Sequence, residues 1–110
     1  MAGLNKYTVQ EAQNAGLGQA GSVYLDTDTT EFTPTNGVVV AITMLSDAVE
    51  FDILTPEDTS LYAGIGGSGY ESKGDALDHS NTFPLGVTIY GRWTSVSIDT
   101  NDMKVMCYIG

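Results

Sequence analysis

Apolar and polar residues alternate along the second half of the chain, and this period of two is typical of β-strands. Valine and isoleucine alternate with threonine, serine and tyrosine over residues 87–90 and 95–98, and residues 103–109 repeat the pattern. Because successive side chains of a strand point to opposite faces of a sheet, each apolar set is expected on one face. The segment 83–110 therefore predicts the strands that organise the fold.

Two local signals divide this segment. Residues 99–102 (DTND) supply turn chemistry, because Asn and Asp tolerate left-handed backbone angles, and they predict a hairpin between the last two strands. Gly91 interrupts the earlier run just before Arg92 and Trp93. It predicts a β-bulge or a close backbone approach.

Four further segments are predicted as strands. Residues 22–25 form a short first strand, and residues 60–63 a short strand later in the chain. Residues 38–45 are apolar without strict alternation, which indicates a strand covered on both faces or central in a sandwich. Residues 49–53 alternate with acidic residues and predict a half-buried strand with an acidic outer face.

These segments predict an all-β fold, a small β-sandwich or jelly-roll-like barrel of about seven short strands. A length of 110 residues suits one domain. Residues 22–110 are expected to form it, and residues 1–21 to form a flexible N-terminal arm. Within the arm, residues 8–11 (TVQE) match a capping box and predict a helix of about two turns that stops at Gly16.

The chain is strongly acidic, with 14 acidic against 4 basic residues and a formal net charge of −10. Such a surface repels phosphate, so neither nucleic acid nor an anionic membrane is an expected partner. The chain has no apolar run long enough to cross a bilayer and no apolar core of a secretory signal at its start. Synthesis in a bacterial cytoplasm is therefore expected.

Two motifs resemble functional sites and are interpreted as coincidences. Residues 64–69 fit G-x-G-x-x-G, but no helix pattern follows, as a dinucleotide site requires. Residues 78–80 (DHS) carry three triad residue types, yet neighbouring residues of a polar loop do not converge on a substrate. With a single histidine in the chain, a multi-histidine metal site is also excluded. We therefore expect no enzymatic activity and no cofactor.

Two acidic turns could hold Ca²⁺ weakly. Residues 26–31 resemble the opening of a calcium loop, but Glu31 occupies the place of the required glycine. Residues 99–102 form a second oxygen-rich turn. Solvated turns are the simpler interpretation of both segments, so no metal site is predicted.

Two single residues have structural interpretations. Cys107, the one cysteine, alternates in phase with Val105 and Ile109, which predicts a small buried hydrophobic side chain. Trp93 is interpreted as a core aromatic, with Arg92 paired to a carboxylate. The alternative is an aromatic sugar-stacking face formed by Trp93 with Tyr90.

The long segment 64–81, with five glycines, is the preferred contact surface, because long loops in small domains are usually functional or disordered. Tyr62 and Tyr70 are its candidate anchors, and Tyr7 and Leu17 are the candidate partner contacts of the arm. An exposed tip without a partner is the competing interpretation.

The ending TFPLGVTIYGRWTSVSI, followed by a strand that closes on CYIG, resembles small virion structural proteins of tailed bacteriophages. The likeness covers about the last quarter of the chain well and contains no catalytic motif. It implies a capsid decoration (cement) protein, with the major capsid protein as partner, homotrimers as the oligomer and the virion as the location. The alternative is a tail-fibre, baseplate or adhesin component that binds a host-surface glycan. A small hydrolase that uses His79 is the weakest hypothesis.

Overall fold

The structure is a computed structural model that describes residues 21–28 and 30–110. Residues 1–20 of the predicted arm, with its helix and with Tyr7 and Leu17, lie outside the described residues. Within them the only helical element is the 3-10 turn η1 (Tyr70–Ser72), and the predicted all-β fold is confirmed. The seven strands, as many as predicted, are β1 (Ser22–Leu25), β2 (Val39–Met44), β3 (Phe51–Pro56), β4 (Ala63–Gly64), β5 (Gly67–Ser68), β6 (Thr88–Ile98) and β7 (Val105–Ile109).

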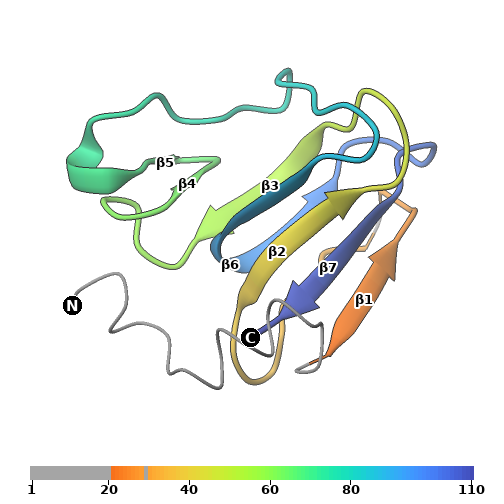
Figure 1. Ribbon diagram of the computed structural model, residues 1–110, viewed down its shortest axis with the longest axis horizontal. Helices are drawn as coiled ribbons and strands as arrows, with labels where there is room; N and C mark the ends of the chain where they lie inside the picture. Colours follow the sequence, from red (N-terminus) through yellow and green to blue (C-terminus); the bar gives the residue numbers. More distant parts are fainter. Residues whose placement is uncertain (1–20, 29) are drawn as a thin grey trace.

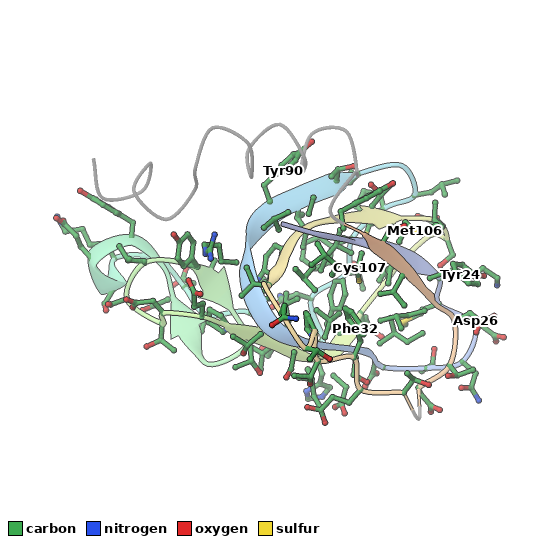
Figure 2. The ribbon with its side chains drawn as sticks, turned by 90° about the horizontal axis from the view of Figure 1, so that it is seen from below. Tyr24, Asp26, Phe32, Tyr90, Met106 and Cys107 are labelled. Carbon is green, nitrogen blue, oxygen red and sulfur yellow. The ribbon has the colours of Figure 1, made fainter. Side chains whose placement is uncertain are left out.

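Five strands form one antiparallel sheet in the order β1-β7-β2-β6-β3, and β4 and β5 pair beside one end of it (Figure 1). The 11-residue β6 belongs to both halves of the sheet, because its first part pairs with β2 and its second part with β3. Phe32 bridges to Val96 in that second part. The sheet therefore curves around one core in the manner of a small sandwich, with Phe32 and Cys107 inside the curve (Figure 2).

A β-bulge allows β6 to change partners. Tyr90 pairs with Ala41 and Trp93 with Val39, so β6 has one residue more than β2 between these pairs. A Cβ atom on Gly91 would lie 2.8 Å from the Trp93 ring. The predicted bulge and the predicted close approach are both confirmed, and they share one cause: the indole folds over a residue without a side chain.

The core consists largely of apolar side chains from the segments predicted as strands, with Leu54 and Trp93 from outside their predicted bounds. Buried side chains come from all five strands of the main sheet, and Phe83 meets Phe51 edge-on at a centroid distance of 5.7 Å. Because protein interiors pack as densely as organic crystals, removing a single methylene group from this core is expected to lower the free energy of unfolding. The buried cluster is Leu25, Val39, Ile42, Met44, Val49, Phe51, Leu54, Trp93, Val96, Ile98, Met103, Val105 and Cys107.

The central strand β2 was recognised correctly, but the expected hairpin between the last two strands is wrong. All β2 residues except Thr43 are buried, and β2 lies between β7 and β6. The turn at residues 99–102 therefore connects β6 to β7. These two strands are not neighbours in the sheet, because β2 lies between them. The physical reason is burial: a strand that is apolar on both faces is most stable between two neighbours, and it displaces the local pairing.

Two further details of the strands differ from the prediction: which residues of β3 are buried, and where the strand after β3 lies. The predicted strand should alternate buried and exposed residues from Val49 to Ile53. An irregularity in the pairing of β3 with β6 between Phe51 and Ile53 shifts this alternation by one residue, so that Leu54 is buried and Ile53 is only half-buried. The strand predicted over residues 60–63 is wrong, because residues 59–62 form turns held by Asp58, whose carbonyl oxygen accepts from the Tyr62 amide at 2.9 Å.

The glycines of residues 64–69 serve close packing against β3. A Cβ atom on Gly64 would lie 2.5 Å from the carbonyl oxygen of Leu54, and one on Gly67 would lie 2.5 Å from Cγ of Pro56. The backbone of β4 therefore packs directly on β3, and Gly67 of β5 packs on the Pro56 ring. The three-residue 3-10 turn η1 follows, whereas a dinucleotide site requires an α-helix at this place.

Candidate protein-binding face

The curved sheet has one face turned away from the core over its first four strands. Strand pairing places Tyr24 beside Met106, and Met106 beside Thr43. Since the alternate residues of the same strands line the core, these side chains point outward. We call this surface the outer face, and it consists of Ser22, Tyr24, Ala41, Thr43, Thr88, Tyr90, Met106 and Tyr108.

Two tyrosines at opposite ends of the outer face are accessible to a partner. Tyr90 on β6 is 74% exposed and Tyr24 on β1 is 45% exposed. Both side chains lie on the outside of the ribbon in Figure 2. Between them, Met106 and Tyr108 are half-buried and Ala41 is buried. Aromatic residues and methionine are enriched at protein interfaces, because they offer large contact area at low entropic cost.

The outer face carries no charge, although the chain as a whole is strongly acidic. β1, β2 and β7 contain no charged residue, and the one charged residue of β6 is Arg92, which is buried. Of the 14 acidic residues, all but Glu11 lie in the described part of the chain, and none lies on the outer face. Depletion of charge is a feature of the cores of protein–protein interfaces.

Local hydrogen bonds and pairing hold this surface in place. The Thr43 and Thr88 hydroxyl groups share a hydrogen bond of 2.8 Å across β2 and β6. Because the face lies on paired strands, its backbone is fixed before any partner binds. The arrangement offers a preformed, uncharged surface with exposed aromatic rings and no group poised for catalysis.

The two candidate anchors of the glycine-rich segment differ in accessibility. Tyr70, on η1, is 68% exposed and remains available for contact. The hydroxyl of Tyr62 is buried, and it has no hydrogen-bond partner among the described residues. Burial raises the pKa of Tyr62, while the positive charge of Arg92 acts in the opposite direction. Tyr70 is thus the stronger of the two candidates.

The triad-like residues 78–80 form a turn. One carboxylate oxygen of Asp78 accepts hydrogen bonds from both the amide and the hydroxyl of Ser80, and these bonds lower the pKa of Asp78. A carboxylate with a lowered pKa is a weak base, so Asp78 does not take the proton of the Ser80 hydroxyl and does not activate it as a nucleophile.

The two acidic turns lie side by side. The Asn101 side-chain oxygen accepts a hydrogen bond of 2.8 Å from the Asp28 amide, which links residues 26–31 to residues 99–102. Nevertheless, no group of three His, Cys, Asp or Glu residues that could hold a metal ion occurs within residues 21–28 and 30–110. The side-chain oxygen of Asn101 is used to connect two loops.

The structural interpretations of Cys107, Trp93 and Arg92 are confirmed. Cys107 is fully buried, and desolvation raises its pKa to about 12. Trp93 is 3% exposed in the core, and Arg92 Nε donates to Glu57 Oε1 at 2.8 Å.

Sequence reasoning did not identify Tyr24 and Met106 as surface candidates. They lie 82 positions apart and become neighbours only through the pairing of β1 with β7. The available signal was the absence of charge at outward positions in an acidic chain. That signal can be interpreted only when the inward positions of each strand are known.

Comparisons with known proteins add no assignment: no protein-family model, curated protein or solved structure matches the chain. Among the helical segments of the described residues, none has the length and hydrophobicity to span a membrane.

Proposed function

We propose that this chain is a structural protein of a tailed-phage virion, namely a decoration protein that binds the outer shell of the capsid. Its partner is the major capsid protein, and its action is passive. Contact area added across coat-subunit junctions stabilises the shell against internal pressure. The proposal extends the resemblance of the C-terminal segment, and the outer face is the structural observation that supports it.

The outer face supports a protein partner because its chemistry differs from that of the remaining surface. A carboxylate that loses water on binding without gaining a partner costs free energy, so a binding face without carboxylates avoids this cost. The exposed rings of Tyr24 and Tyr90 supply apolar area for the contact. The acidic loops around the face keep free copies soluble and apart.

The experiment is a binding assay with shells assembled from the coat protein of the same virus. The purified chain is mixed with these shells and sedimented, and its ratio to coat protein is measured. A saturating, fixed ratio and a raised disruption temperature of the shells are expected. A chain that stays in the supernatant at all concentrations would contradict the proposal.

Homotrimers form part of the proposal, because decoration proteins of the resembled class are commonly threefold. β1 lies at the edge of the sheet and, among residues 21–28 and 30–110, pairs with β7 alone, so its other edge offers backbone groups to a neighbouring copy. Light scattering at two concentrations tests the oligomer. A constant mass near three times 11.7 kDa is expected, and a strict monomer would contradict the trimer.

The second candidate is a tail-fibre, baseplate or adhesin component that binds a host-surface glycan, and the exposure of Tyr70 favours it. This side chain is 68% exposed on η1, where Glu71 and Ser72 hold left-handed backbone angles. A glycan screen with the wild-type chain and Tyr70→Ala tests this candidate. Binding that disappears in the variant would favour the adhesin over decoration.

A further inference from the structure

A hollow of about 350 Å³ lies beside β6, apart from most of the outer face. Pockets of this size are at the lower end of those that bind small molecules. Its walls are largely apolar and come from β4, from the segment before β6 and from β6 itself. The lining residues are Ala63, Asp75, Leu77, Phe83, Ile89, Tyr90 and Trp93.

The walls are held in place by separate contacts. The Trp93 indole donates a hydrogen bond of 2.9 Å to the carbonyl oxygen of Ala63, which joins β6 to β4. The Leu77 amide donates to the Gly64 carbonyl oxygen at 3.0 Å, and this bond fixes the segment that carries Asp75. Phe83 pairs with Val49 through two backbone hydrogen bonds of 2.9 Å. The hollow is therefore preformed.

Asp75 gives the hollow a negative charge. All three basic residues in the described part of the chain are engaged elsewhere: Lys73 with Glu71, Arg92 with Glu57, and Lys104 with the carbonyl oxygen of Asp102. The Asp75 carboxylate thus has no ion-pair partner among the described residues. In a chain of net charge −10, electrostatic repulsion opposes an anionic ligand and favours a cationic one.

Aromatic rings and a carboxylate together suit one class of ligand. The face of an aromatic ring carries negative charge density and attracts cations, and methylated ammonium groups also bring apolar surface to such rings. Here the exposed ring of Tyr90 lies at the hollow together with Phe83 and Trp93, and Asp75 supplies the countercharge. We propose that this hollow binds a small organic cation, an alkylated ammonium group of the quaternary type.

The single tryptophan makes the proposal directly measurable, because Trp93 lines the hollow and is the only indole in the chain. The full chain is titrated with choline while tryptophan emission and tyrosine side-chain NMR signals are recorded. The matched ligand is the neutral carbon isostere of choline, in which a tert-butyl group replaces trimethylammonium. Saturable binding of choline, and at least about fivefold weaker binding of the isostere, is expected.

Variants locate the site. Asp75→Asn and Tyr90→Leu are each expected to weaken choline binding about fivefold. Asp52→Asn removes the same charge from an exposed position on β3, and Tyr70→Leu removes an exposed ring outside the hollow. Both controls are expected to bind choline as the wild type does. Circular dichroism of every variant confirms that it is folded.

Three results would overturn the proposal. Equal binding of choline and its isostere would mean that charge is not recognised. Binding of a neutral hexose without binding of choline would assign the hollow to a saccharide instead. No saturable response to any of these ligands would leave the hollow without a ligand of this class. Tyr90 belongs to both the hollow and the outer face, whereas Asp75 lies outside the outer face, so Asp75→Asn is the variant that separates choline binding from capsid binding.

Discussion

The Trp93 indole Nε1 donates a hydrogen bond of 2.9 Å to the carbonyl oxygen of Ala63. This bond joins the middle of β6 to β4, across the point where β6 changes partner from β2 to β3. One side chain therefore fills the core, covers Gly91 and attaches the small β4–β5 pair to the main sheet.

Replacing Trp93 with phenylalanine tests this role. Trp93→Phe keeps an aromatic ring but removes the hydrogen bond and part of the buried volume, and it is expected to lower the free energy of unfolding by about 2 kcal/mol. Urea denaturation followed by circular dichroism measures the change. Tyr90→Phe, on the same strand at an exposed position, is the control and is expected to unfold as the wild type does. Equal stability of both variants would contradict the role of the indole.

The ion pair between Arg92 and Glu57 is expected to stabilise the fold more than the ion pair between Lys73 and Glu71. Their side chains are 9% and 29% exposed, whereas those of Lys73 and Glu71 are 76% and 52% exposed. Water and salt screen the second pair. Glu57→Gln is therefore expected to cost about 1 kcal/mol of stability, and Glu71→Gln less than about 0.5 kcal/mol. A larger loss for Glu71→Gln in chemical denaturation would reverse this ranking.

Cys107 is expected to make folding stability fall at high pH. Burial raises its pKa from 9.0 to about 12, so the unfolded chain loses the thiol proton near pH 9 while the folded chain retains it. Deprotonation then favours the unfolded state between these two values, and stability declines as the pH rises through that window. Plots of the free energy of unfolding against pH should diverge in slope between the wild type and Cys107→Ala in this window.

A thiol reagent gives a second measurement. In the native wild type at pH 8, it should react with Cys107 only as fast as the chain opens. Parallel slopes together with rapid labelling would contradict the buried thiol.

Any side chain at position 64 is expected to lower the stability of the fold for steric reasons. An added Cβ atom would lie 2.5 Å from the Leu54 carbonyl oxygen, so Gly64→Ala must push β4 away from β3. A cost of about 2 kcal/mol is expected. Gly66→Ala is the matched control: it has φ +87° but nothing within 4 Å, so only the backbone penalty of about 1 kcal/mol applies. Thermal unfolding of both variants decides, and a smaller effect at Gly64 would contradict the close contact.

The sequence located most strands of the main sheet from their apolar residues. Residues 95–98 and 103–109 show a period of two, whereas the central strand was recognised as an apolar run without strict alternation. Strand order could not be read in the same way. The turn at residues 99–102 suits a hairpin of β6 with β7. Burial of the apolar strand β2 between them stabilises the sheet more than direct pairing of β6 with β7 would.

The candidate site was harder to predict than the fold. Tyr24 and Tyr90 belong to one surface only because β7 and β2 separate and align their strands. Tyr62 and Tyr70 were chosen for their place in a long loop, yet the hydroxyl of Tyr62 is buried and only Tyr70 is well exposed. Local composition identifies a loop, but accessibility depends on how that loop packs.

The most direct test of the proposed function uses a charged version of the outer face. The double variant Tyr24→Asp/Tyr90→Asp adds two carboxylates to the uncharged surface at its two most exposed aromatic side chains. The matched control, Tyr70→Asp/Leu85→Asp, adds the same charge at two exposed apolar residues outside the outer face. Each protein is sedimented with shells of the coat protein, and the bound ratio is measured. The account predicts that the wild type and the control bind at the same fixed ratio and that the outer-face variant stays in solution. Undiminished binding of a folded outer-face variant would contradict it.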